Sequence, residues 1–263
     1  MKNFFLSIAL LCLGTTAALA AVQGKEVEYT ANGTTLKGWI AHDDTLMEKR
    51  PAVLVVHEWW GHNAYARKRA RMLAELGYVA LAVDMYGDGK QAHHPDEAGK
   101  FASEVSKNKP LAKARFDAAM KLLREHDKVD GSRLAAIGYC FGGSVVLEMA
   151  RTGEDMKGVV SFHGGLGTDT PAQPGKVKAQ VRSFTGADDK MIPAAQVEAF
   201  KQEMEKAGAN YRVVVYPDVK HSFTNPDADA LGKQFNLPLA YNAEADRVSW
   251  LQTQTFLSDV LKK

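Results

Sequence analysis

The stretch Gly138-Tyr139-Cys140-Phe141-Gly142-Gly143 decides how this chain is expected to fold. Residues 134–138 form a short apolar run typical of a buried strand, and a helix is expected to begin just past Cys140. Glycines at positions 138 and 142 predict a turn so tight that a Cβ atom there would clash with a neighbouring strand or helix. Such a turn strains its central residue and presents it as a nucleophile.

The position of Cys140 at this turn is expected to increase the reactivity of its thiol. The dipole and free amides of a helix N-terminus favour a thiolate, and the backbone N–H of Phe141 is placed to stabilise an oxyanion. The other interpretation is a glycine-rich turn around a buried cysteine that acts as a small apolar side chain. The partner residues below favour the nucleophile.

Strand-like and helix-like segments alternate on both sides of this turn. Strands are predicted at residues 26–30, 35–41, 52–56, 78–83, 134–138, 158–162, 180–185 and 211–216. Besides the helix past Cys140, helices are predicted at residues 63–76, 96–106, 111–126, 194–207 and 243–261. The alternation predicts an α/β fold in which one mostly parallel central sheet carries helices on both faces. In such sheets the functional site lies at the carboxyl ends of the strands.

A cysteine nucleophile at such a turn needs a histidine and an acid. Asp189 follows the predicted strand at residues 180–185, and His221 follows the strand at residues 211–216. Successive parallel strands end at one edge of the sheet, so both side chains can converge on Cys140. The order of nucleophile, acid and histidine along the chain also suits this kind of turn.

Asp188 is the alternative acid. In α/β-hydrolases, which share this nucleophile turn, the acid commonly lies three residues after a glycine and four before a proline. Asp189 has both offsets, from Gly186 and Pro193. Asp188 is more suited to capping the turn or facing solvent.

The remaining histidines suggest no metal site. The pair His93-His94 has no second cluster of ligands, which favours a solvated loop. His163, followed by two glycines, lies at another strand end, where it can be near the site, although a packing or turn role is preferred. We expect neither a metal nor an organic cofactor.

Residues 57–61, His57-Glu58-Trp59-Trp60-Gly61, follow the first predicted central strand. The loop after this strand normally supplies the second oxyanion donor, and the backbone N–H of Trp59 is the candidate. Glu58 is expected on the inner side of the loop, near the thiol. Glu58 could instead be a surface glutamate, but the two adjacent tryptophans indicate a partly apolar site enclosed by aromatic side chains.

Residues 1–20 have the order of a secretory signal peptide. Lys2 is followed by an apolar run at residues 4–13 and by Ala18-Leu19-Ala20, and cleavage is expected after Ala20 or Ala21. A membrane anchor is the alternative, but the apolar run is short for a bilayer. No later stretch is long and apolar enough to span a membrane, so we expect a periplasmic or secreted protein. Cleavage would leave Cys140 as the only cysteine.

The charge of the expected mature chain is nearly balanced. The 33 Lys and Arg residues less Lys2 leave 32, against 31 Asp and Glu, for a net charge of about +1. No basic stripe is present, which argues against nucleic acid as a partner. The length suits one large domain, residues 21–263, and the oligomeric state is left open.

The chain resembles the dienelactone hydrolase family of α/β-hydrolases. The matching segments cover most of the expected mature chain; they are residues 56–58, 83–86, 138–143, 186–193, 221–223 and 245–250. The resemblance implies an α/β-hydrolase fold and a cysteine hydrolase of the carboxymethylenebutenolidase type. It also implies that a glutamate at the position of Glu58 contacts the resting thiol, and that substrate binding rearranges this contact to release the thiolate to the Cys–His pair.

Two arginines of the dienelactone-cleaving members have no counterpart here. Those members hold the carboxylate of the substrate with one arginine after the strand at residues 78–83 and another four residues past the catalytic histidine. This sequence has Tyr86-Gly87-Asp88-Gly89 in the first region and Asn225 at the second position. Neither offers the bidentate fork that suits a carboxylate, so a neutral ester or lactone is at least as good a candidate substrate.

The sequence therefore predicts a hydrolase that cleaves a small-molecule ester or lactone with Cys140 as nucleophile, His221 as base and Asp189 orienting the base. The alternative is a small-ligand-binding protein without catalysis on the same fold, because fold alone does not fix function. The complete set of three residues argues for the enzyme.

Overall fold

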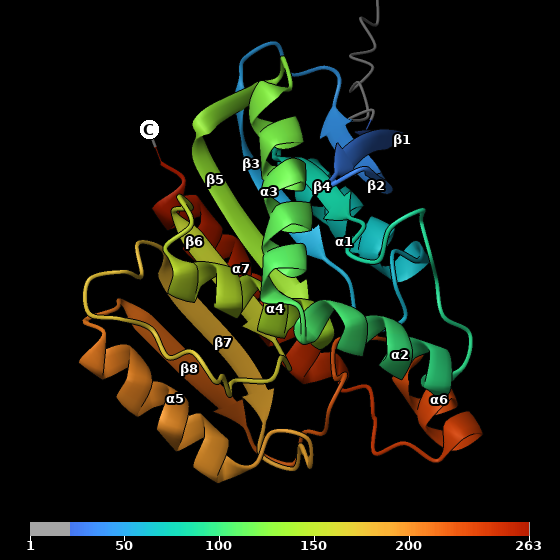
Figure 1. The fold of residues 1–263 in the computed structure, drawn as a ribbon, viewed down its shortest axis with the longest axis vertical. Helices are drawn as coiled ribbons and strands as arrows, with labels where there is room; N and C mark the ends of the chain where they lie inside the picture. Colours follow the sequence, from blue (N-terminus) through green and yellow to red (C-terminus); the bar gives the residue numbers. More distant parts are fainter. Residues whose placement is uncertain (1–21, 263) are drawn as a thin grey trace, which may run out of the picture.

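One eight-stranded sheet forms the centre of the computed structural model, which describes residues 22–262 (Figure 1). The strands are β1 (Val22–Ala31), β2 (Thr34–Asp43), β3 (Arg50–Val56), β4 (Val79–Val83), β5 (Val129–Tyr139), β6 (Gly158–Phe162), β7 (Gln180–Gly186) and β8 (Tyr211–Tyr216). Their order across the sheet is β1-β2-β4-β3-β5-β6-β7-β8. The pairs β1–β2 and β2–β4 are antiparallel, and every other neighbouring pair is parallel.

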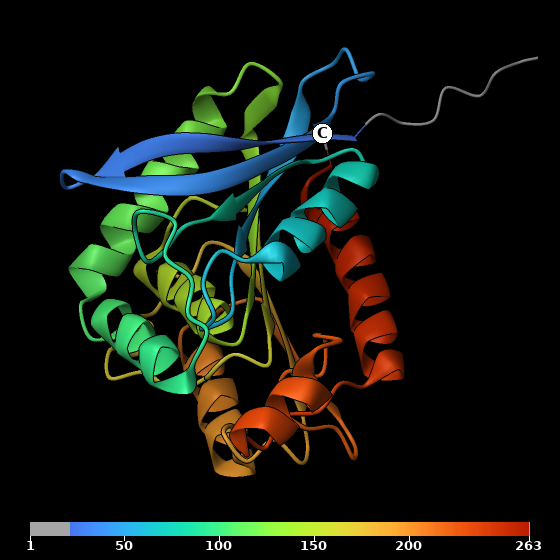
Figure 2. The same ribbon diagram turned by 90° about the vertical axis from the view of Figure 1, so that its right-hand side faces the viewer.

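Helices cover both faces of the sheet. They are α1 (Ala64–Glu75), α2 (Pro95–Ser106), α3 (Lys109–Glu125), α4 (Phe141–Thr152), α5 (Ala194–Lys206), α6 (Ala228–Phe235) and α7 (Ala243–Val260). Figure 2 shows α3, α4 and α5 on one face and α1 and α7 on the other. Because β3 and β5–β8 run parallel, the loops that follow them gather at one edge of the sheet, and the site lies there.

The apolar residues of the central strands supply a core on each face. In β3, Leu54 and Val56 belong to the core cluster on the face covered by α3 and α4, whereas Val53 and Val55 belong to the cluster on the face covered by α1. The alternation follows from strand geometry, since successive side chains point to opposite faces. Both faces of β3 are covered, which explains why its sequence is a continuous apolar run.

The predicted fold class is confirmed, and all eight predicted strands are present. β6 and β8 have the predicted bounds, and the Asn63 side chain caps α1 by accepting hydrogen bonds from the amides of Tyr65 and Ala66. β5 is longer than predicted because it begins at Val129, which pairs with Arg50 of β3; the register then shifts, and regular pairing resumes at Ala52 and Leu134.

Helix α6 was not predicted. It is short and contains Gly232, and its apolar side chains Leu231 and Phe235 pack against the distant Trp60. Its stability therefore depends on tertiary contacts rather than on local pattern.

The predicted signal peptide, residues 1–20, lies outside the described residues. Within residues 22–262, no helix combines the length and the apolar character needed to cross a bilayer.

Candidate active site

Cys140 occupies the turn between β5 and α4 with strained backbone angles, φ 51° and ψ −115°. The flanking glycines explain how the turn can exist. A Cβ atom on Gly138 would lie 2.1 Å from the carbonyl oxygen of Gly142, and one on Gly142 would lie 2.3 Å from that of Val56. The predicted steric need for both glycines is thus confirmed, and strain of this kind is common at functional sites.

His221 connects the thiol to an aspartate. Its Nε2 atom lies 3.1 Å from the Sγ atom of Cys140, and its Nδ1 atom lies 2.8 Å from Oδ2 of Asp189. The second carboxylate oxygen of Asp189 accepts a hydrogen bond from the Met191 amide at 2.8 Å. Asp189 and His221 are buried, whereas Asp188 is exposed, so the structure places Asp189 and not Asp188 against the imidazole.

The ends of three strands bring these side chains together. Cys140 follows β5, Asp189 follows β7 and His221 follows β8, and all three strands run in the same direction. The turn that carries the histidine is strained as well, because Ser222 has a φ of 59°.

The charges around His221 favour its protonated form. Burial by itself lowers the pKa of an imidazole, but here the adjacent Cys140 and the hydrogen-bonded Asp189 raise the pKa of His221 to about 10. At neutral pH the imidazole is therefore an imidazolium that faces the sulfur atom. This arrangement stabilises a thiolate.

Glu58 is buried near the site but is hydrogen-bonded to Asn225 rather than to the thiol. Its Oε2 atom accepts a hydrogen bond from Asn225 Nδ2 at 2.7 Å, while Oε1 has no hydrogen-bond partner among residues 22–262. Burial raises the pKa of Glu58, and the hydrogen bond from Asn225 opposes that shift. The resting contact between this glutamate and the thiol, which the resemblance implies, is not the one present in this structure, because Cys140 Sγ pairs with His221.

Trp59 and Phe141, the two candidate oxyanion donors, lie on segments that touch each other. The Gly142 amide donates to the carbonyl of His57 at 3.0 Å, which joins the loop of Trp59 to the start of α4. The amide of Phe141 is at the first helical position, where a helix leaves its N–H groups without intrahelical acceptors. The peptide that carries the Trp59 N–H is held by the contact of His57 Nδ1 with the Glu58 carbonyl at 2.6 Å, and the Tyr86 hydroxyl donates to the next carbonyl, that of Trp59, at 2.9 Å.

A packing or turn role was preferred for His163, yet it contacts the backbone of Cys140 directly. Its Nδ1 atom accepts a hydrogen bond from the Cys140 amide at 3.1 Å. The side chain is fully buried, and its ring packs edge-on against that of His221 at 5.2 Å between centroids. The sequence signal was its place at the end of β6, beside the strand that precedes Cys140.

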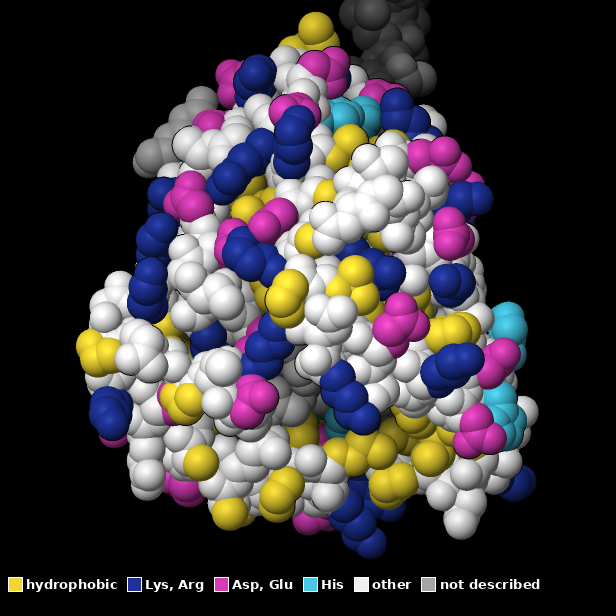
Figure 3. Space-filling view, in the orientation of Figure 1, with side chains coloured by type: hydrophobic (Ala, Val, Ile, Leu, Met, Phe, Trp, Pro, Cys, Tyr) yellow, Lys and Arg dark blue, Asp and Glu magenta, His cyan; other side chains and the backbone are white. Residues whose placement is uncertain are grey.

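Aromatic and aliphatic side chains line the region beside this site. Trp59, Trp60, Phe101, Phe235 and Leu237 pack together where α2 and α6 meet. Figure 3 shows apolar side chains gathered in that part of the face, whereas positive and negative side chains are mixed over the rest of it.

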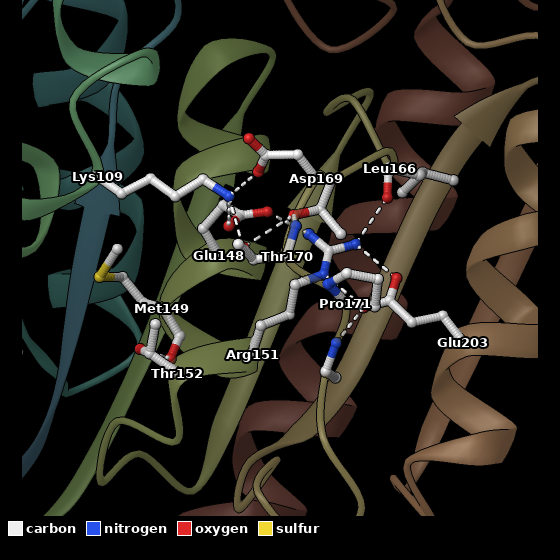
Figure 4. Close-up of polar contacts among 12 residues, drawn as sticks. Lys109, Glu148, Met149, Arg151, Thr152, Leu166, Asp169, Thr170, Pro171 and Glu203 are labelled. Carbon is white, nitrogen blue, oxygen red and sulfur yellow. Dashed lines mark hydrogen bonds and ion pairs between the residues drawn. The ribbon is translucent and has the colours of Figure 1, made fainter.

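A cavity of about 860 Å³ lies to one side of these residues, between α3, α4 and the segment at residues 167–170. Lys109 contacts Asp169 and Glu148 there, and Arg151 pairs with Glu203 at 2.8 Å (Figure 4). None of Cys140, Asp189 and His221 lines the cavity, which begins on α4 at Ser144, one turn past Cys140. It is therefore a neighbour of the site and not its centre.

Within the part of the chain that the structure describes, no three His, Cys, Asp or Glu side chains cluster in a way that could hold a metal ion.

A mostly parallel sheet with a cysteine at a strand-to-helix turn is the arrangement of an α/β-hydrolase. Comparison with known proteins identifies the family within this class. The model of the dienelactone hydrolase family matches residues 36–261, so the chain belongs to that family. The curated Protein usf of Aquifex pyrophilus is 30% identical over 207 residues, which cover 77% of this chain and 87% of that protein. A relative from Aquifex aeolicus, provisionally named carboxymethylenebutenolidase, is 29% identical over 206 residues, with the same coverage of 77% and 87%.

A solved structure supports the same assignment. The crystal structure of a dienelactone hydrolase-like promiscuous phosphotriesterase from metagenomic libraries has a TM-score of 0.86 and 33% sequence identity. The match covers 92% of this chain and 99% of that one. The family and the α/β-hydrolase fold predicted from the sequence are therefore confirmed.

Proposed function

We propose that this protein cleaves a neutral ester or lactone by acyl transfer to Cys140. The thiolate attacks the carbonyl carbon and forms a C–S bond, while the carbonyl electron pair moves to the oxygen. The amides of Phe141 and Trp59 hold this oxyanion. When the tetrahedral intermediate collapses, the C–O bond to the alcohol breaks, and the His221 imidazolium gives its proton to the leaving oxygen.

The thioester formed in this way is then hydrolysed. Neutral His221 takes a proton from a water molecule, which attacks the thioester carbon. Collapse releases the carboxylic acid and restores the Cys140 thiolate and the His221 imidazolium. Asp189 keeps the imidazole in the orientation that both steps need.

The observation that carries this proposal is the continuous contact from Asp189 through His221 to Cys140, with distances of 2.8 and 3.1 Å. A protein that only bound a ligand would not need a strained cysteine next to a charged, carboxylate-oriented histidine. A binding function without catalysis is the rival, since many functions share this fold.

The residues around the thiol support an uncharged substrate. Asn225 takes the place of the second family arginine, and its amide already binds Glu58. Close to Cys140, the Tyr86 ring packs against Phe141 and Trp59 packs beside Trp60, so the neighbouring surface is aromatic. A substrate carboxylate would meet the buried Glu58 there, and Asn225 cannot offer it the bidentate guanidinium contact that an arginine at this position would.

We also propose that the protein is exported and acts in the periplasm or outside the cell. The support is the signal-peptide pattern of residues 1–20. Fractionation of cells, with sequencing of the mature N-terminus, tests this proposal. A cytoplasmic protein that retains residues 1–20 would contradict it.

The experiment for the enzymatic proposal compares the purified protein with Cys140→Ala. The substrates are p-nitrophenyl acetate, neutral lactones, dienelactone and a neutral phosphate triester, the last because of the phosphotriesterase relative. We expect turnover of neutral esters or lactones by the wild type and none by the variant. Equal rates from the two proteins, or no turnover together with an unreactive thiol, would favour the binding protein.

A further inference from the structure

His163 is a buried histidine for which the mechanism above has no use. It follows the last residue of β6, and its φ of 41° is unusual for a residue with a side chain. It is fully buried, so it cannot reach a substrate. Strained residues persist only where their surroundings hold them firmly, which directs attention to the contacts of this side chain.

Both ring nitrogens of His163 are engaged by the two loops that meet at the site. Nδ1 accepts the Cys140 amide hydrogen at 3.1 Å, and this amide also reaches the carbonyl of Phe162 at 2.9 Å. Because Nδ1 is an acceptor, the proton of the neutral ring is on Nε2. Nε2 therefore donates to Thr224 Oγ1, at 2.7 Å.

Thr224 belongs to the loop of the base, three residues after His221, and is itself firmly held. Its hydroxyl lies 2.7 Å from the Tyr65 hydroxyl. Its carbonyl accepts from Arg69 at 2.7 Å, and Arg69 also forms a salt bridge with Asp246 of α7 at 2.5 Å. The contact chain thus ties His163 to α1 and α7 as well as to the nucleophile.

His163 stays neutral in this environment. Burial, followed by the nearby charges of His221 and Arg69, holds its pKa well below the usual range. A second imidazolium beside the charged His221 would oppose the thiolate pair. A neutral ring keeps one acceptor for Cys140 and one donor for Thr224.

We propose that His163 is a positioning residue that clamps the backbone of Cys140 to the loop of His221 and thereby sets the distance between sulfur and imidazole. The effect of this positioning on turnover rests on the proposed function. The clamp itself acts on the thiol, so it can be tested without any substrate.

The test measures the rate of carbamidomethylation of Cys140 by iodoacetamide as a function of pH, together with steady-state kinetics. His163→Phe keeps a ring but removes both hydrogen bonds, and Thr224→Val removes the distal one with little change in shape. We expect each variant to raise the midpoint pH of thiol reactivity by about one unit, a tenfold change in the underlying equilibrium. We expect kcat to fall about a hundredfold, since small misplacements of reacting groups have effects of that order, with KM little changed.

Two further variants separate positioning from packing. His163→Asn presents an amide oxygen near the place of Nδ1 and should recover part of the lost reactivity. Thr253→Val is the matched control for Thr224→Val, because Thr253 is equally buried but bonds only within α7. It should leave the pH profile unchanged.

If His163→Phe and Thr224→Val both kept the wild-type midpoint pH of thiol reactivity and only their melting temperatures fell, the proposal would be overturned and His163 would have a purely structural role. A shift in His163→Phe without one in Thr224→Val would also overturn it, because the link to the base loop would then be irrelevant. If His163→Phe does not fold, the pH profile of thiol reactivity in Thr224→Val tests the proposal by itself. Failure of the enzymatic proposal is seen separately, as equal turnover by the wild type and Cys140→Ala.

Discussion

Asn225 donates its side-chain amide to Glu58 at 2.7 Å, and both residues are buried beside the candidate active site. Glu58 follows β3, whereas Asn225 lies four residues after His221, so the contact joins two loops far apart in the sequence. A neutral amide thus occupies the position where the dienelactone-cleaving relatives are expected to carry an arginine. Glu58 is thus hydrogen-bonded to a neutral amide, while His221 and Arg69 act on it only through their charges.

The first prediction concerns this pair. Asn225→Ala removes the hydrogen bond to Glu58 Oε2, and we expect a loss of about 1–3 kcal/mol in the free energy of unfolding. The pKa of Glu58 should rise further, because the hydrogen bond opposes the effect of burial. Urea denaturation measures the loss, with the exposed Asn210→Ala as control. Equal stabilities of the two variants would show that the contact contributes nothing.

The second prediction is a pH dependence of stability. Burial raises the folded-state pKa of Glu58 above its usual 4.5. The contribution of this group to the stability of the wild type is therefore fully present below pH 4.5 and is lost as the pH rises through the folded pKa. Glu58→Gln removes this loss. The variant should match the wild type near pH 4 and melt at a higher temperature at pH 7. Melting curves that differ by the same amount at every pH would contradict this.

The third prediction concerns the charge of His221. With its pKa at about 10, the imidazole should remain protonated at pH 8, and nitrogen NMR of the ring can show this. Because this pKa lies above the usual value of about 6.5, the group contributes stability below that pH and loses it as the pH rises through about 10. In Cys140→Ala the pKa should be lower, since the sulfur no longer raises it. A neutral ring at pH 8 in the wild type would count against the ion pair.

The fourth prediction separates the two adjacent aspartates. Asp189→Asn removes the carboxylate that orients His221, and kcat should fall by about four orders of magnitude, as such changes do in comparable triads. Asp188→Asn alters an exposed neighbour and should leave kcat near the wild-type value. Ester hydrolysis measured on both variants gives the answer. A large effect of Asp188→Asn with a small effect of Asp189→Asn would reverse the assignment.

The fifth prediction concerns the turn that holds Cys140. Gly142→Ala would place a methyl group 2.3 Å from the carbonyl oxygen of Val56, so we expect severe destabilisation or failure to fold. Gly99 lies in α2 with open space around it, and Gly99→Ala should stabilise the protein by about 0.5–1 kcal/mol. Thermal melts compare the two. A Gly142→Ala protein as stable as the wild type would mean that the turn relaxes more easily than its geometry indicates.

The strands of the sheet could be predicted well because their local pattern and their tertiary role agree. Residues 158–162 and 211–216 are short apolar runs, and they form β6 and β8 with those bounds. Asp189 and His221 were found because each follows such a strand, and the ends of parallel strands must share one edge of the sheet. Topology alone therefore brought the acid and the histidine to Cys140.

Other features of the site have no local signature. Helix α6 exists because Leu231 and Phe235 find Trp60, which lies far away in the chain. The residues next to His163 in the sequence give no indication that its ring joins Cys140 to Thr224. Whether a hydrogen bond forms between distant loops depends on distances of a few tenths of an ångström, which sequence patterns do not encode.

The sequence by itself determined the class of fold, the nucleophile turn and the order of the three candidate catalytic residues, because strand periodicity and the need for Gly138 and Gly142 are local properties. Only the tertiary structure decided that Glu58 pairs with Asn225 and that His163 holds the Cys140 amide. These contacts arise where loops after β3, β5, β6 and β8 meet, and they satisfy polar groups that burial has removed from water.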